Sequence, residues 1–258
     1  AWLEEWLQCE FINFDVLVAP VTTSWSVVTL TGPRARDLLA EANTSFSLDG
    51  DAFPHMSVQS GTVAGIATRV MRVSYTGETS YEINVPTGRS IELWDILMRH
   101  GAAYGLTPIG IDAWNLLRLE KGYLHIGADT DGTTTPLNIG WDHIMRRKAD
   151  FVGKRSLMLP LYQDADRLQL VGLSATGSAP LPIGAHLVRD CGDGRASDGF
   201  VTSSAFSPLF RKGVALALVH GGASRIGESV ALEHEGCRLS ATIINPNLYD
   251  PEGARLNG

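Results

Sequence analysis

Ser74-Tyr75-Thr76-Gly77-Glu78-Thr79-Ser80-Tyr81-Glu82-Ile83 is the stretch of this sequence that decides its fold. Runs with the composition of strands lie on both sides, at 68–73 and 81–85. The polar, glycine-containing segment between them is typical of a turn. The sequence therefore predicts a hairpin in which Tyr75 and Glu82 flank the turn.

An aromatic ring and a carboxylate on such a rigid hairpin suit a flat, amide-rich heterocycle such as a pterin. The ring face can pack on the heterocycle, and an ionised carboxylate accepts two parallel N–H donors. Side chains alternate along a strand, so Tyr81 and Ile83 should anchor one face while Glu82 points from the other toward a cavity. The alternative is an ordinary hairpin with a solvated glutamate.

Around this hairpin, strand and helix patterns are intermixed rather than strictly alternating, which favours α+β layers over a doubly wound nucleotide fold. The helix at 90–100 should place Ile91, Trp94, Leu97 and Met98 inward. The expected strands lie at 14–19, 25–30, 56–59, 61–64 and 66–73, and the expected helices lie at 34–43, 90–100 and 109–121.

From residue 170 onward the pattern changes to short β-rich runs separated by Gly, Pro, Asn and Asp clusters, which predict a small antiparallel barrel or sandwich. These runs lie at 170–173, 185–188, 199–203, 214–219, 229–232 and 237–244. A polar patch at 163–167 marks the expected boundary. We therefore predict an α+β domain at 1–165 and a β-barrel domain at 166–258.

Composition limits the classes of function. The chain has 258 residues, a formal net charge of −7 and a sequence pI near 5.5, so it lacks the basic character of nucleic-acid-binding proteins. No apolar run approaches membrane-spanning length, and the amino terminus lacks the pattern of a secretion signal. We expect a soluble cytoplasmic protein without a nucleic-acid or membrane partner.

Cysteine and histidine spacing predicts no metal site. Cys9, Cys191 and Cys237 lie far apart and are expected to be free thiols in a reducing compartment. None of the 7 histidines forms a helical i, i+4 pair or a cluster at ligand spacing. The sequence also lacks the glycine-rich motifs that bind phosphates and dinucleotides.

Several segments, in their order along the chain, carry a family resemblance: the hairpin, 118–123 and the ending at 249–255. With 25–36, 150–154 and 203–219, they resemble the folate-dependent aminomethyltransferases, whose founding member is the T-protein of the glycine cleavage system. Within that family the chain is most similar to the carboxy-terminal region of heterotetrameric sarcosine oxidase alpha subunits. The resemblance implies interleaved α+β domains around a folate channel, followed by an antiparallel β-barrel.

The same resemblance implies the site residues. Glu82 would grip the amino-pyrimidine edge of the pterin, Tyr75 and Tyr123 would line the folate pocket, and Trp141 would lie near the cofactor. Each tyrosine could equally be a core residue. At Trp114, T-proteins carry an arginine that helps to bind folate, and an indole cannot replace its charge. Arg118 and Glu120 are expected to be structural ion-pair partners or helix-surface charges.

The implied function is to hold tetrahydrofolate while an imine, made elsewhere by flavin-dependent oxidation of sarcosine, delivers its one-carbon unit as 5,10-methylenetetrahydrofolate. FAD, FMN and NAD are expected only on other regions or on other sarcosine oxidase subunits. Because the chain begins at Ala1 inside a predicted amphipathic helix, we expect a longer polypeptide. The resemblance then implies that the family's catalytic aspartate lies upstream of residue 1.

Several alternative functions remain open. Within the enzyme class they are a free T-protein-like aminomethyltransferase, part of a dimethylglycine dehydrogenase and a folate-dependent O-demethylase. Outside it they are a scaffold domain whose folate site has decayed, for which Trp114 is the best evidence, and a folate-binding module without catalysis. Folate-binding proteins of iron–sulfur cluster assembly, an example of the last class, carry a cysteine where this chain has Tyr123, and its absence argues against them.

Overall fold

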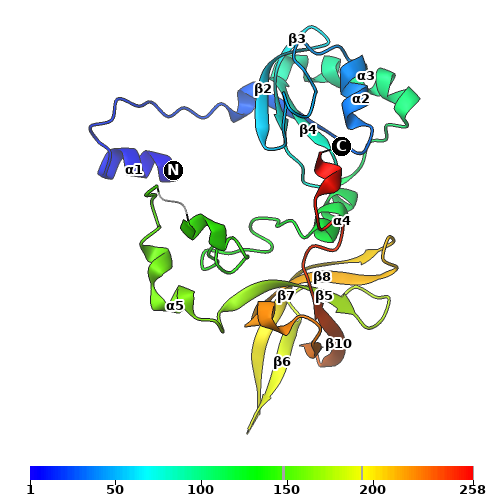
Figure 1. Ribbon diagram of the computed structural model, residues 1–258. Helices are drawn as coiled ribbons and strands as arrows, with labels where there is room; N and C mark the ends of the chain where they lie inside the picture. The colour runs from blue at the N-terminus through cyan, green and yellow to red at the C-terminus, as the bar shows by residue number, and fades with distance from the viewer. Residues whose placement is uncertain (147–148, 193, 258) are drawn as a thin grey trace. The chain divides into compact units, whose positions relative to one another are not determined.

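A computed structural model gives the structure of residues 1–146, 149–192 and 194–257 (Figure 1). These residues form two units. Unit 1 contains residues 1–73, 79–107 and 257, and unit 2 contains residues 74–78 and 108–256. The turn of the predicted hairpin therefore belongs to one unit and its two strands to the other.

Unit 1 is built on an antiparallel sheet with the strand order β1-β4-β3-β2. Its strands are β1 (Trp25–Thr31), β2 (Ser57–Val63), β3 (Ile66–Arg72) and β4 (Ser80–Pro86). Two helices, α2 (Ala35–Glu41) and α3 (Ser90–Gly101), lie on one side of it (Figure 1). The hairpin strands predicted around residues 68–73 and 81–85 pair as β3 and β4.

Alternation along β4 determines which face of the sheet is buried. Tyr81, Ile83 and Val85 are 0% exposed and lie in a core with leucines of α2 and α3. Glu82 and Asn84 therefore project from the other face of the strand. A hairpin whose apolar residues recur at every second position has only one way to bury them, so its register is strongly specified.

Unit 2 contains α4 (Ile111–Lys121) and a closed antiparallel barrel, which confirms the barrel prediction. In barrel order the strands are β10 (Cys237–Ile244), β5 (Leu168–Ala175), β8 (Lys212–His220), β7 (Gly194–Ser207), β6 (His186–Cys191) and β9 (Ser229–His234). Leu119 of α4 packs against Val214 and Leu216 of β8, outside the main barrel core. This contact joins the helix to the barrel wall.

The remaining helices of the described residues are short: α1 (Trp2–Cys9), α5 (Pro160–Gln163) and several single turns of 3-10 helix. None of the helices described in either unit has the length and apolar character that crossing a bilayer requires. The two units are defined by contacts within the chain, and α4 belongs to the same unit as the barrel. Such units need not coincide with domains, so the domains at 1–165 and 166–258 stay a prediction.

Several local predictions were wrong. The run at 14–19 is not a strand, because it pairs with no neighbouring strand in the described residues, and an unpaired strand leaves its backbone groups unsatisfied. The runs at 56–59 and 61–64 belong to one strand, β2, rather than two. In α3, Leu93 and Leu97 are buried, whereas Ile91 and Trp94 are exposed.

Candidate functional site

Glu82 lies near the middle of β4, on the face of the sheet opposite α2 and α3. Its cross-strand neighbours are Thr29 on β1 and Met71 on β3. The flanking Tyr81 and Ile83 are fully buried, so the side chain of Glu82 between them points away from the core. The carboxylate thus projects from a paired central strand, which holds it more rigidly than a loop would.

The electrostatic environment of Glu82 is unusual for a glutamate. Its side chain is partly buried, and this burial raises the pKa of the carboxyl group above its ordinary value. Within the described residues it takes part in no ion pair or side-chain hydrogen bond. A partly desolvated carboxylate without donors is energetically poor until a ligand supplies them. Two parallel N–H groups would satisfy both of its oxygens.

Tyr75 and Trp114 form an aromatic pair in unit 2. Their ring centroids are 5.6 Å apart with an interplanar angle of 30°, and the Tyr75 hydroxyl donates to the carbonyl of Leu124 at 3.3 Å. Tyr123 lies just beyond the end of α4. Burial raises the pKa of both Tyr75 and Tyr123, so both phenols stay protonated at neutral pH. The Tyr75–Trp114 pairing could not be predicted from sequence spacing.

Lys121 and the C-terminal segment hold the turn that carries Tyr75. Gly77 has φ +86°, and a Cβ added there would lie 2.6 Å from Cδ of Lys121, so the lysine stem packs directly on the turn. Its Nζ donates to the carbonyl of Asp250 at 2.6 Å. Glu78 accepts a hydrogen bond from the hydroxyl of Tyr249, whose pKa is raised to about 12 by burial and by that bond. These contacts give 249–255 a structural role.

Arg118 and Glu120 are buried, so the helix-surface interpretation was wrong. Arg118 pairs with Asp129 at 2.5 Å, not with Glu120, and also donates to Oγ of Ser203 at 2.8 Å. Glu120 accepts a hydrogen bond from the hydroxyl of Ser207 at 2.5 Å. Both side chains therefore fasten α4 to strand β7 of the barrel.

Trp141 occupies a different part of unit 2. It is 47% exposed and lines a cavity of about 520 Å³ with Ile144 and Phe151 among the described lining residues. Neither Tyr75 nor Tyr123 belongs to that described lining. The structure thus groups Tyr75 with Trp114 and does not group Trp141 with them.

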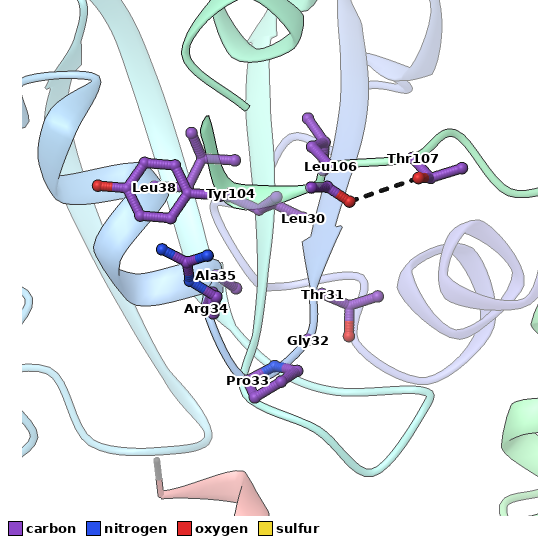
Figure 2. A pocket seen from close by; sticks show the side chains of 11 residues that line it. Leu30, Thr31, Gly32, Pro33, Arg34, Ala35, Leu38, Tyr104, Leu106 and Thr107 are labelled. Carbon is purple, nitrogen blue, oxygen red and sulfur yellow. Dashed lines mark hydrogen bonds between the residues drawn. The ribbon is translucent and has the colours of Figure 1, made fainter. Parts of the chain in front are cut away.

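A pocket of unit 1 lies beside the start of α2 (Figure 2). Its volume is about 290 Å³, and it is lined by 30–35, Leu38 and 104–107. Arg34 lies there with its guanidinium 4.5 Å from the ring centroid of Tyr104. Leu30 and Leu38 belong to the core between the sheet and the helices, so this pocket opens on the helix-covered side of the sheet and not on the face of Glu82.

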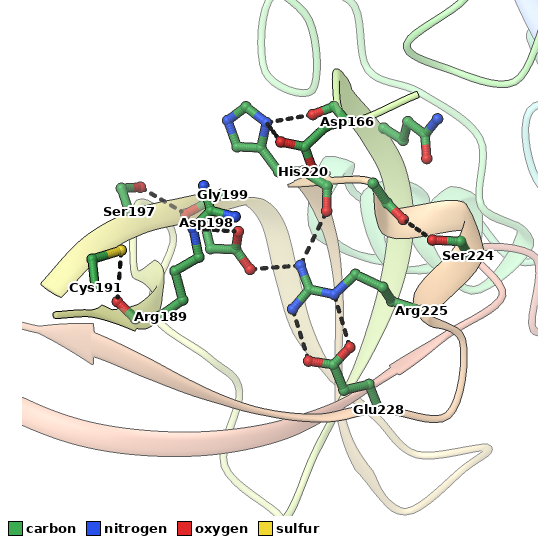
Figure 3. Close-up of polar contacts among 12 residues, drawn as sticks. Asp166, Arg189, Cys191, Ser197, Asp198, Gly199, His220, Ser224, Arg225 and Glu228 are labelled. Atoms are coloured by element: carbon green, nitrogen blue, oxygen red, sulfur yellow. Dashed lines mark hydrogen bonds and ion pairs between the residues drawn. The ribbon is translucent and has the colours of Figure 1, made fainter. Parts of the chain in front are cut away.

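A charged cluster of the barrel joins Arg225 to two acidic side chains (Figure 3). Arg225 donates to Asp198 at 2.5 Å and to both oxygens of Glu228 at 2.8 Å. The hydrogen bond to Glu228 is the largest cause of the raised pKa of Arg225. In the described parts of the chain, no group of three or more His, Cys, Asp or Glu side chains could hold a metal ion.

Comparison with known proteins finds two matching family profiles. The profile described as "GCVT N-terminal domain" matches residues 1–149, and "Glycine cleavage T-protein C-terminal barrel domain" matches residues 169–250. The chain is 38% identical to sarcosine oxidase subunit alpha of Corynebacterium sp. (strain P-1), covering 100% of this chain and 27% of that protein. It therefore spans only about a quarter of the length of that relative.

Two aminomethyltransferases are also similar to the chain. The protein from Halothermothrix orenii is 32% identical, over 81% of this chain and 57% of that one. The crystal structure of glycine cleavage system aminomethyltransferase T from Bartonella henselae matches with a TM-score of 0.74 and 25% identity, covering 98% of this chain and 66% of that one. The chain therefore belongs to the glycine cleavage T-protein family, with the T-protein fold and its C-terminal barrel.

Proposed function

We propose that this chain is the tetrahydrofolate-binding, aminomethyltransferase-like part of a sarcosine oxidase alpha subunit. It would capture the one-carbon unit of oxidised sarcosine as 5,10-methylenetetrahydrofolate. The observation that carries the proposal is the carboxylate of Glu82, which is partly desolvated and has no partner in the described residues. Family membership and 38% identity to a sarcosine oxidase alpha subunit support it.

Glu82 would bind and orient the ligand. Its two oxygens would accept the N–H groups of the amino-pyrimidine edge, which fixes the plane and rotation of a pterin. Tetrahydrofolate, when bound, supplies the nitrogen nucleophiles that accept the one-carbon unit. Holding these nitrogens close to a short-lived electrophile and away from bulk water prevents its hydrolysis to formaldehyde. Binding roles for Tyr75, Tyr123 and Trp141 stay predictions.

The oxidation itself would take place elsewhere in the assembly. We infer that FAD, FMN and NAD are bound by other regions or other subunits of the oxidase, and that those subunits are the chain's partners. Cys9, Cys191 and Cys237 are free and exposed, which supports the inference of a reducing, cytoplasmic compartment.

A free aminomethyltransferase of the glycine cleavage type is the second candidate. The 32% identity to the Halothermothrix orenii aminomethyltransferase, over 81% of this chain, supports it. Identity favours the oxidase, at 38% against 32%. The two functions differ in the one-carbon donor, so assays with oxidised sarcosine and with an aminomethylated carrier protein would separate them.

Titration calorimetry of the full-length protein with tetrahydrofolate tests the site. Glu82→Gln keeps the shape of the side chain but removes its charge and one acceptor, so the dissociation constant should rise roughly tenfold or more. Glu92→Gln is the matched control, because that carboxylate lies on α3 of the same unit and pairs with Arg89 on the surface. Equal affinity of the wild type and Glu82→Gln would contradict the proposal.

Product analysis tests the one-carbon step. In the full-length protein, Glu82→Gln should leave sarcosine consumption nearly unchanged while formaldehyde replaces methylenetetrahydrofolate as the product. Unaltered yield of methylenetetrahydrofolate in that variant, at tetrahydrofolate concentrations below the wild-type dissociation constant, would show that Glu82 does not hold the acceptor.

A further inference from the structure

Arg69 shares the open face of the unit 1 sheet with Glu82. In the strand register Arg69 pairs with Asn84, and Asn84 also pairs with Val27. Asn84 and Glu82 are two residues apart on β4, so their side chains project from the same face, and cross-strand partners share a face as well. Arg69 therefore lies one row of side chains from Glu82, on the face opposite the helices.

The guanidinium of Arg69 lies over an aromatic ring at the end of that face. Its central carbon is 5.4 Å from the ring centroid of Trp25, on β1. The strand β4 runs between β1 and β3, so the side chain crosses β4 to reach the indole. A cation over an indole is attracted to the ring's electrons and is held in a restricted position. The side chain of Arg69 thus lies on the face that carries Glu82, with its guanidinium over the row of Pro86, on the side of Asn84 away from Glu82.

Neither charge on this face is neutralised by another side chain in the described residues. Arg69 forms no ion pair there, and its residue is exposed. Burial is the only resolved cause of the altered pKa of Glu82, so the guanidinium does not compensate the carboxylate in this ligand-free structure. An anionic acceptor and a cationic side chain therefore share one sheet face without being joined. Their backbones are one row apart, and the guanidinium lies over Trp25, whose β4 partner Pro86 is four residues from Glu82.

The spacing of these two groups suits a ligand that presents donors and an acceptor along one edge. Same-face neighbours along a strand are about 7 Å apart at Cα, and diagonal neighbours across strands are about 7–8 Å apart. An arginine side chain is long enough to bring its donors to an atom beside the Glu82 carboxylate. On the amino-pyrimidine edge, a ring carbonyl follows directly after the two N–H donors. A carboxylate cannot bind that carbonyl, but a guanidinium, which has only donors, can.

We propose that Arg69 is a second ligand-binding residue, which donates a hydrogen bond to the ring carbonyl next to the N–H groups held by Glu82. The inference rests on the proposed function and adds Arg69 as the residue that recognises the ring carbonyl. Arg69 selects a pterin that carries this carbonyl over an analogue that carries an amino group at the same position. The amino group and the guanidinium are both hydrogen-bond donors, so they cannot bond to each other. The guanidinium also repels the analogue when its ring is protonated. On ligand binding the guanidinium leaves Trp25, which lies two rows of side chains from Glu82, and turns toward the ring carbonyl.

The test compares tetrahydrofolate with tetrahydroaminopterin, which replaces only that carbonyl oxygen by an amino group. Both ligands are titrated into the full-length protein, as the wild type and as Arg69→Ala. Losing a hydrogen bond from a charged donor should weaken tetrahydrofolate binding roughly tenfold or more. Binding of tetrahydroaminopterin should be unchanged or tighter. The effect of Arg69→Ala on the binding free energy of tetrahydrofolate, minus its effect on that of tetrahydroaminopterin, measures the contact between Arg69 and the carbonyl.

Two further variants separate charge from packing. Arg69→Met keeps an apolar stem over Trp25 and should bind like Arg69→Ala, whereas Arg69→Lys keeps a donor and should restore part of the affinity. Arg34→Ala is the matched control, since Arg34 also stacks on a ring of unit 1, 4.5 Å from the Tyr104 centroid, but lies in the pocket on the helix-covered side (Figure 2). That variant should bind both ligands as the wild type does.

The outcomes distinguish this inference from the proposed function. If Glu82→Gln loses tetrahydrofolate while Arg69→Ala binds both ligands as the wild type does, the site stands and the role of Arg69 is overturned. If Arg69→Ala weakens both ligands equally, Arg69 acts through packing and not by reading the carbonyl, and the inference is overturned. If the wild type binds neither ligand, both are overturned.

Discussion

Replacing Arg118 by methionine should destabilise unit 2 strongly, because it leaves a buried carboxylate without its cation. The side chain of Arg118 is 5% exposed and that of Asp129 is 0% exposed, and the two lie 2.5 Å apart. Asp129 also accepts hydrogen bonds from Thr202 and Ser203 at 2.6 Å and from the backbone N–H of His125 at 2.8 Å. These neutral donors remain in the variant, but they do not balance the charge.

The size of the expected loss in stability follows from the burial of both Arg118 and Asp129. Breaking a buried ion pair by removing one partner costs about 3–5 kcal/mol, whereas replacing both partners by apolar residues is far less costly. Arg118→Met should therefore lower the free energy of unfolding by about 3 kcal/mol or more. The double variant Arg118→Met/Asp129→Asn should recover about 2 kcal/mol of that loss, because it removes the unpaired charge and keeps an oxygen that accepts from Thr202 and Ser203.

Urea unfolding of the wild type, both single variants and the double variant completes the thermodynamic cycle. Arg238→Met is the control: Arg238 is exposed on β10, and its replacement should change stability by less than about 0.5 kcal/mol. The reasoning is refuted if Arg118→Met costs less than about 1 kcal/mol, or if the effects of the two single substitutions simply add in the double variant.

Three further predictions concern the turn, the site and the barrel. Gly77→Ala should cost about 1–3 kcal/mol in thermal unfolding, because φ is +86° and the new Cβ would lie 2.6 Å from Cδ of Lys121; an unchanged melting temperature would contradict this. Glu82 has a raised pKa, so the folded state binds more protons than the unfolded state between the two pKa values, and stability falls as the pH rises through that window. Ligand-free Glu82→Gln should therefore be more stable than the wild type at pH 7, and a pH series should show the gain vanishing below the unfolded pKa of about 4.3. Arg225→Ala should lower the barrel's unfolding free energy by about 3 kcal/mol, since the side chain of Asp198 is 3% exposed and loses a partner at 2.5 Å; urea unfolding would refute this by showing no change.

The barrel and the central hairpin could be predicted from sequence because their signals are local. Alternating apolar residues mark each strand, and glycine-rich or polar clusters mark the turns between them. In β4 the same alternation buries Tyr81 and Ile83 and thereby fixes the face from which Glu82 projects. The direction of the Glu82 side chain is thus encoded within a few residues of the chain.

The long-range contacts of unit 2 could not be predicted, because they join residues far apart in sequence. Arg118 meets Ser203 across 85 positions, and Tyr75 meets Trp114 through the packing of the turn in unit 2. A single sequence contains no signal for such pairs. The helix at Ser90–Gly101 shows a related limit: its apolar positions outnumber those that face the core, and only the fold decides that Ile91 stays exposed.

The position of Arg69 relative to Glu82 and Trp25 could not be predicted from the sequence. Its alternation with buried Thr68 and Val70 marks it as an outward residue, which from sequence alone reads as an ordinary solvated charge. Only the strand order places it beside Glu82 and brings its guanidinium across β4 to Trp25.

The position of a bound pterin relative to Glu82 tests the account most directly. A crystal structure of the full-length protein with tetrahydrofolate should show two N–H groups of the amino-pyrimidine edge donating to the two carboxylate oxygens of Glu82, at about 2.7–2.9 Å. A pterin bound elsewhere, with the Glu82 carboxylate still facing water, would contradict the central claim.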